Sequence, residues 1–252
     1  MNEYLKNLDR IEFLVTLACT GKCKHCSEGE HIAQKEHIDG DSAARAVKTL
    51  YGEYKIQSLM TFGGEPMLYF RDVCKIHAAA KEMNIPKRQL ITNGFFTKDK
   101  AVIKDAASEL SKSWVNDILL SVDAFHQETI PLETVKLFAA AVLSAGIPVR
   151  SHPAWLVGKD AHNIYNDRTR EILREFTDMG IPSSDGNIIF PAGNALKYLS
   201  EYFNPNDLPT NPYDEDPRDI HSVCFSPDGG VLGGNIHNDD IAAILASYKP
   251  AD

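Results

Sequence analysis

The sequence predicts an α/β fold in which parallel β-strands alternate with α-helices, either as a barrel or as an open sheet. Two observations support this prediction. Short apolar runs alternate six times with longer amphipathic stretches. Polar residues suited to binding or catalysis follow each apolar run, and in parallel α/β folds active sites lie in the loops at the carboxyl ends of the strands.

The expected elements follow one another without an internal repeat. Apolar runs predict strands at residues 11–17, 56–62, 88–94, 117–124, within 147–157, and at 187–195. The amphipathic stretches between them predict helices at residues 40–54, with Asp41 or Ser42 as N-cap, and at 70–83, 99–111, 132–145 and 168–179. One end of the sheet is therefore expected to carry all the polar loops.

The chain changes character after the sixth apolar run. Residues 204–219 are rich in Pro, Asn and Asp, which predicts a loop or linker. A β-hairpin turning at residues 227–229 and a short helix near 239–248 are expected to follow. We therefore predict a main unit over residues 1–195, and a linker with a hairpin–helix extension over residues 196–252.

The composition narrows the function classes. The chain has 252 residues, a net charge of −9 and 43% hydrophobic residues, which is ordinary for a globular enzyme. It has no cluster of Lys and Arg, which argues against a nucleic-acid or anionic-membrane partner. Neither a secretory signal pattern nor an apolar run near the roughly 20 residues of a membrane span is present. A cytoplasmic location is the expectation.

Three of the five cysteines lie within eight residues, as Cys19, Cys23 and Cys26 in the segment CTGKCKHC. Clustered thiols and an odd total favour metal or redox chemistry over a disulfide framework. Three thiolates bind a four-iron cluster with one iron left open, whereas structural zinc needs four ligands. A zinc or structural cluster site completed by His25, Cys74 or Cys224 remains the alternative.

The C-x3-C-x2-C motif is followed, after the second predicted strand, by GGEP at residues 63–66. The pair resembles the radical S-adenosylmethionine (radical SAM) superfamily over about residues 11–195, including the ring-bearing His25 before the third cysteine. The resemblance implies a partial (βα)6 TIM-like barrel with a short C-terminal β-hairpin–helix extension. It also implies one [4Fe-4S] cluster on Cys19, Cys23 and Cys26, whose fourth iron is chelated by SAM.

The resemblance also implies an activity. An external donor such as flavodoxin or ferredoxin would supply one electron, which would cleave SAM to methionine and a 5'-deoxyadenosyl radical. That radical would abstract hydrogen from an unreactive C–H bond, so the protein is expected to be an oxygen-sensitive oxidoreductase.

Several residues are implied to bind SAM. Gly63 and Gly64 would let the backbone approach it closely, Glu65 would accept from its amino group, and Pro66 would stiffen the turn. Residues after the later strands complete the expected set, together with His25: Asn93, Ser121, Asp123, Arg150 as a carboxylate partner, and Asn194 in a loop resembling one that approaches adenine.

Three residues are candidates for catalysis. His126 and Tyr165 follow the fourth and fifth predicted strands and can exchange a proton. Cys224 lies in a segment that resembles the SPASM/twitch extension of peptide-modifying relatives but lacks its accompanying cysteines, so one cluster is expected. A buried structural thiol is the favoured interpretation of Cys224, with a hydrogen-atom donor as the alternative.

The substrate is expected to be a small molecule or a short peptide. The first strand begins within a dozen residues of Met1, which favours direct presentation of the substrate. An activating enzyme for a protein radical is the first alternative, although CSEGEH differs from that group's usual loop. A non-catalytic iron–sulfur or zinc protein that binds a partner is the second. Epimerisation, cross-linking and rearrangement stay undecided.

Overall fold

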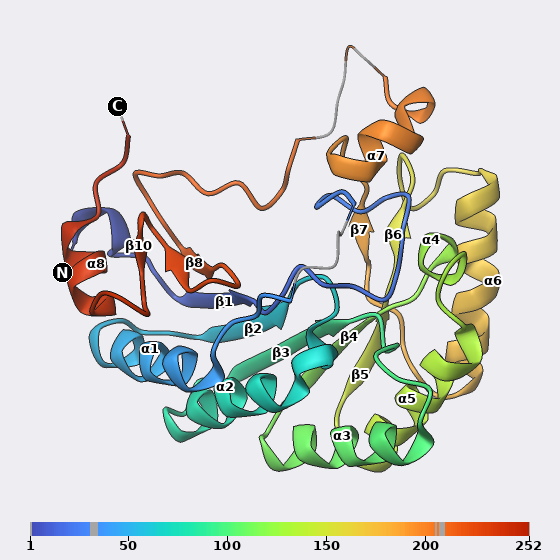
Figure 1. Ribbon diagram of the computed structural model, residues 1–252. Helices are drawn as coiled ribbons and strands as arrows, with labels where there is room; N and C mark the ends of the chain where they lie inside the picture. The colour runs from blue at the N-terminus through green and yellow to red at the C-terminus, as the bar shows by residue number, and fades with distance from the viewer. Residues whose placement is uncertain (1, 31–34, 205, 207–209, 252) are drawn as a thin grey trace.

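Six parallel strands form the central sheet, in the order β5-β4-β3-β2-β1-β8 (Figure 1). The computed structural model describes residues 2–30, 35–204, 206 and 210–251. The strands of this sheet are β1 (Arg10–Leu14), β2 (Ser58–Phe62), β3 (Lys87–Thr92), β4 (Asp117–Ser121), β5 (Val149–His152) and β8 (Ser222–Phe225). A parallel sheet flanked by helices is the predicted α/β class, and it has the form of a partial TIM barrel.

Helices α1, α2, α3 and α5 lie along one face of this sheet (Figure 1). The helices are η1 (Glu3–Leu5), α1 (Gly40–Glu53), η2 (Pro66–Tyr69), α2 (Phe70–Glu82), α3 (Lys100–Lys112), α4 (Ala124–Gln127), α5 (Leu132–Ser144), α6 (Ile164–Asp178), α7 (Gly193–Tyr198), η3 (Ser200–Tyr202) and α8 (Ile241–Ser247). The expected N-cap of the first α-helix is wrong. Asp39 caps it instead, because its carboxylate accepts from the Ser42 N–H.

Side chains of the sheet alternate between two faces. Ile11 and Phe13 of β1 are fully buried in the main core, which lies between the sheet and the helices. Arg10 and Glu12 point to the opposite face and are half-buried. We call this second face, which α1, α2, α3 and α5 do not cover, the inner face.

The expected sixth strand at residues 187–195 is wrong in its pairing. Only β7 (Asn187–Ile188) forms there, and it pairs with β6 (Ala154–Trp155) in a separate two-stranded sheet. The sixth strand of the main sheet is β8, which lies parallel to β1 because Val223 and Phe225 extend the core beyond Ile11 and Phe13. A turn is present at residues 227–229, but the β-hairpin predicted around it is wrong. The antiparallel pair is β9 (Gly230–Val231) with β10 (Gly234–Asn235), and it turns at residues 232–233, where both residues have the positive φ that a two-residue hairpin turn requires.

In the part of the chain that the structure describes, no helix is both long and apolar enough to cross a membrane.

Candidate active site

The three clustered cysteines lie in the loop after β1, which we call the cysteine loop (residues 15–30). Cys23 is buried and Cys19 and Cys26 are half-buried, and none of them forms a disulfide. Burial raises the pKa of Cys19 to about 11, and burial with the nearby Asp123, Cys19 and Cys26 raises that of Cys23. The thiols therefore lie close enough together to raise one another's pKa, and metal binding would release their protons.

The GGEP turn is hydrogen-bonded to the start of the cysteine loop. The Gly64 N–H donates to Thr16 O at 2.8 Å, and the Glu65 N–H donates to Ala18 O at 2.8 Å. Gly63 has φ +141°, and a Cβ there would lie 2.5 Å from Thr16 O. The side of these glycines where a side chain would point is therefore occupied by the chain's own backbone.

Glu65 is fully buried and joins the turn to β3. Its carboxylate accepts from the Met67 N–H at 2.9 Å, the Thr92 hydroxyl at 2.6 Å and the Asn93 N–H at 2.8 Å. Burial raises the pKa of Glu65 to about 7, although these three hydrogen bonds act to lower it. Both oxygens thus have protein partners, and Pro66 begins η2 directly after it. Glu65 therefore positions the GGEP turn against β3, and its contact with the SAM amino group stays a prediction.

Two asparagines from distant segments contact the cysteine loop. Asn93, after β3, places its amide nitrogen 3.6 Å from Cys19 Sγ. Asn194, in α7, donates from its backbone to Cys26 O at 2.9 Å and from its side chain to Cys23 O at 3.1 Å. Both were predicted to bind SAM. In the structure they hold the loop that carries the thiols, and Figure 1 shows α7 beside this N-terminal segment.

A polar group beside Cys23 consists of the fully buried Asp123 and the half-buried His126 and His25. The His126 ring nitrogen Nδ1 lies 2.8 Å from Asp123 Oδ2, and the same oxygen accepts from the Ala154 N–H at 3.0 Å. Burial alone would raise the pKa of Asp123, but His126 and His25 outweigh it and hold the pKa below its usual range. The His25 ring packs on His126 with centroids 4.8 Å apart.

The family model for the radical SAM superfamily matches residues 13–195. The chain belongs to the radical SAM superfamily. Its cofactors are accordingly a [4Fe-4S] cluster and SAM, and the likeness of residues 196–252 to a SPASM/twitch extension stays a prediction.

Two curated relatives are GTP 3',8-cyclases. A probable GTP 3',8-cyclase of Sulfolobus acidocaldarius is 33% identical over 127 residues, 48% of this chain and 37% of the relative. The GTP 3',8-cyclase of Desulforamulus reducens is 24% identical over 132 residues, 51% of this chain and 38% of the relative. The chain thus aligns with less than two fifths of each relative's length.

Solved structures share the fold at low identity. SuiB of Streptococcus suis bound to S-adenosylmethionine has a TM-score of 0.59 at 14% identity, covering 96% of this chain and 66% of SuiB. The anSMEcpe enzyme with bound AdoMet has a TM-score of 0.58 at 14% identity, covering 96% and 80%. Both likenesses show that the chain has the fold of these two structures.

The residues of the cysteine loop fit the cluster of a radical SAM enzyme. Three thiols lie on one loop, and the other two cysteines lie elsewhere, with Cys74 on α2 in the helix layer. A competing donor set is present, because the Cys23 thiol and one ring nitrogen each of His25 and His126 lie within 4.8 Å of one another. This set offers a zinc ion three ligands around the same thiol.

Arg150 and Ser121 differ in their contacts. The Arg150 guanidinium was predicted to bind the SAM carboxylate, but it forms a two-point ion pair with Asp117, at 2.7 and 3.2 Å, on the inner face. Ser121 is 9% exposed at the end of β4 and pairs in register with His152 of β5. Ser121 therefore lies at the strand ends as predicted, whereas Arg150 already has a carboxylate partner.

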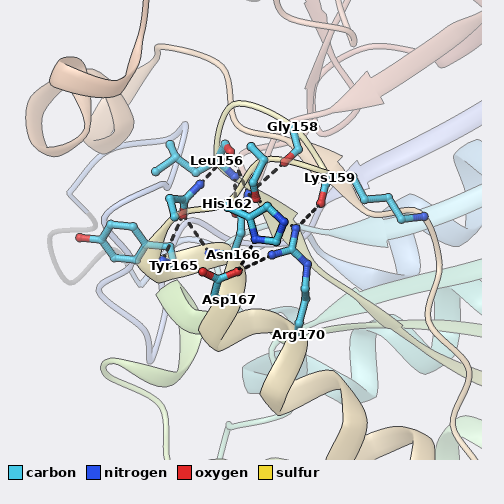
Figure 2. A network of polar contacts seen from close by, with 10 residues as sticks. Leu156, Gly158, Lys159, His162, Tyr165, Asn166, Asp167 and Arg170 are labelled. Carbon is cyan, nitrogen blue, oxygen red and sulfur yellow. Dashed lines mark hydrogen bonds and ion pairs between the residues drawn. The ribbon is translucent and has the colours of Figure 1, made fainter.

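Tyr165 belongs to a second, smaller core. Its ring stacks on Phe125 with centroids 4.5 Å apart. The loop before it is rigid, because the buried Asn166 side chain accepts from the Leu156 N–H and donates to three carbonyls, among them Gly158 O (Figure 2). The Tyr165 ring is thus held by stacking on Phe125, and its role in proton exchange stays a prediction.

Cys224 is exposed, which differs from the expectation of a buried thiol. It lies on the inner face of β8, directly opposite Glu12 of β1. Partial burial, together with the carboxylates of Glu12 and Glu28, raises its pKa to about 12. Its thiol is therefore kept protonated close to the cysteine loop.

Sequence reasoning missed the polar residues of the inner face, among them Glu12, Gln89 and Asp117. Each was hidden inside or at the start of an apolar strand. The signal that could have found them is the period of two in a strand, which puts every second side chain on the face away from the helices.

Proposed function

We propose that this chain is a radical SAM enzyme that abstracts hydrogen from a substrate held on the inner face of its barrel. The observation that supports this most is the cysteine loop, whose backbone is held by the GGEP turn and Asn194 and whose Cys19 thiol is contacted by Asn93. Such support fixes the ligands without completing the metal site, which suits a cluster with an open iron.

The bound cofactors supply reductive cleavage of SAM and a hydrogen-abstracting radical, with the electron coming from an external donor such as flavodoxin or ferredoxin. The chain's own residues do the remaining work. Cys19, Cys23 and Cys26 hold the cluster. Asp123, which is fully buried, and His126 form a hydrogen-bonded pair beside Cys23.

A short peptide is the favoured substrate, and a nucleotide is the alternative. SuiB has been solved with the precursor peptide SuiA, and anSMEcpe with the Cp18Cys peptide, both over nearly all of this chain. The relatives named GTP 3',8-cyclase support the nucleotide, over about half of this chain. The same preparation can be offered both substrates.

The test is anaerobic reconstitution with iron and sulfide, reduction with dithionite and addition of SAM, followed by measurement of 5'-deoxyadenosine. Wild-type protein should load about four irons and release 5'-deoxyadenosine. Cys23→Ala should abolish both, while Cys74→Ala, in the helix layer, should leave both unchanged. Zinc retained through Cys23, His25 and His126, with no electron resonance change on adding SAM, would support the non-catalytic alternative instead.

Epimerisation is a second candidate, favoured by the exposed thiol of Cys224 on the inner face. An epimerase must return a hydrogen atom to the opposite side of the abstracted position, and a thiol beside the substrate can donate one. Cys224→Ala should then stop product formation while 5'-deoxyadenosine release continues. Unchanged product stereochemistry in Cys224→Ala would remove this role.

A further inference from the structure

A row of mainly polar side chains crosses the inner face of the sheet. The strand register sets five residues side by side on neighbouring strands, in the order Cys224, Glu12, Met60, Gln89 and Asp117. Corresponding layers inside closed TIM barrels are filled by branched apolar side chains. Four of these five side chains instead carry hydrogen-bonding groups, so this layer is suited to contact with a polar molecule.

The row is neutral overall, because each of its carboxylates has a guanidinium partner. Arg10 pairs with Glu12, and Arg150 pairs with Asp117 at 2.7 Å. The Gln89 amide also donates to Asp117 at 2.7 Å. The carboxylates are largely covered, with 17% and 16% of their side chains exposed, while 31% of Arg10 and 39% of Arg150 remain exposed. Guanidinium N–H donors therefore stay accessible next to acceptor oxygens.

This charge pattern selects between ligand classes. A triphosphate is bound by cations that are free to neutralise it, and both guanidinium groups here are already paired. A peptide backbone is uncharged and offers both N–H donors and carbonyl acceptors. The row presents the complementary set, since the partly exposed Arg10 and Arg150 donate and Glu12 and Asp117 accept.

The length and place of the row match a short peptide. Five strands at about 4.8 Å spacing span about 19 Å, the length of about six extended residues. Glu12 and Met60 lie three residues before the cysteine loop and the GGEP turn, hence about 10 Å along the strands from them. A ligand on the row would therefore lie close under the cofactor.

We infer that the row Cys224–Glu12–Met60–Gln89–Asp117, with Arg10 and Arg150, is the substrate subsite for an extended, uncharged peptide segment of about six residues. This inference rests on the proposed radical SAM function and names its substrate class. The segment would lie across the strands, with its backbone amides on the row.

The experiment mixes the holoenzyme, loaded with cluster and SAM, with each probe under anaerobic conditions. Ultrafiltration then separates bound from free probe, and mass spectrometry measures the amount that the protein retains. One probe is a pool of N-acetylated, C-amidated hexapeptides without charged side chains, and the other is GTP. Wild-type protein should retain members of the pool and not GTP. Asp117→Asn leaves Arg150 unpaired, so peptide retention should fall about tenfold and GTP retention should rise. Asp185→Asn, which alters an exposed ion pair with Lys159, is the matched control and should change neither.

Arg150→Gln provides a second variant, which should weaken peptide retention without gaining GTP. Circular dichroism and iron content establish that each variant is folded and loaded. Retention of GTP in place of peptides by the wild type, or retention of neither, overturns the inference.

The same preparation separates this inference from the proposed function. Release of 5'-deoxyadenosine without peptide retention leaves the radical chemistry standing and removes the peptide subsite. Peptide retention that Asp117→Asn weakens, in protein that never cleaves SAM, leaves the subsite standing and removes the radical function.

Discussion

At the scale of single residues, Asp123 and His126 are expected to act on the cluster in opposite directions. The ionised Asp123 accepts from His126 Nδ1, and a ring nitrogen of His126 lies within 4.8 Å of the Cys23 thiol. Hydrogen bonds and charge near the cysteine sulfurs set the reduction potential of an iron–sulfur cluster. The polar ring should stabilise the reduced, more negative cluster, and the buried carboxylate should destabilise it.

His126→Ala should therefore lower the cluster potential, and Asp123→Asn should raise it. Loss of one hydrogen bond of about 1 kcal/mol corresponds to a shift of about 40 mV for one electron. Potentiometric titration followed by electron resonance measures both. Shifts of the same sign in the two variants would show that these residues act on the loop's structure alone.

At the scale of elements, the GGEP turn and the cysteine loop should behave as one unit. A Cβ on Gly64 would lie 2.7 Å from Leu17 O, and backbone cannot move aside as a flexible side chain can. Gly64→Ala should cost about 1–3 kcal/mol of folding free energy and reduce iron loading. Gly52, in α1, has no atom within 4 Å of its Cβ position, so Gly52→Ala should stabilise the protein by about 0.5–1 kcal/mol with full loading.

The packing of α2 on β2 predicts that the stability of the fold depends on pH. His77 of α2 is fully buried beside Thr61 of β2, with its Nε2 2.9 Å from the Thr61 hydroxyl. Burial, with Arg88 nearby, lowers the pKa of His77 to about 3. The unfolded chain binds this proton near pH 6.5, so the stabilisation is full above pH 6.5 and is lost as the pH falls from 6.5 towards 3.

Urea unfolding of the cluster-free protein at pH 7.5 and 5.5 measures this effect. Protonation of this one histidine in the unfolded chain should lower the free energy of unfolding by about 1.4 kcal/mol between pH 7.5 and 5.5. The His77→Gln variant should lack this part of the pH dependence. His162→Gln, whose side chain is 83% exposed, should keep it. An equal slope in wild type and His77→Gln would contradict the assignment.

The sequence allowed the order of elements to be predicted because a period of 2 or 3.6 is local information. The pairing of β8 with β1 was missed because it joins residues more than 200 apart, and nothing local to Ser222–Phe225 specifies a neighbour. The cysteine triad was predictable from its spacing. The contacts of Glu65 and Asn194 were not, because both residues hold segments that meet only in the folded chain.

At the scale of the whole molecule, the C-terminal strand ties the chain's two ends into one sheet. Phe225 of β8 stacks on Phe13 of β1 with ring centroids 4.7 Å apart, and both are fully buried. The Asn2 side chain also donates to Leu245 O at 2.9 Å and to Tyr248 O at 2.8 Å. These contacts join residues 196–252 to the first strand and the N-terminal residues, so we expect this segment to fold together with the barrel.

Phe225→Ala should destabilise the whole sheet, because it leaves a cavity between β8 and β1. The expected cost is about 3–5 kcal/mol, against little change for Leu196→Ala, whose side chain is 56% exposed. Hydrogen exchange should show the amides of β2 and β3 losing protection together with those of β8. Loss of protection confined to residues 196–252 would instead mean that the C-terminal segment unfolds by itself and that the predicted division near residue 195 is a boundary in folding.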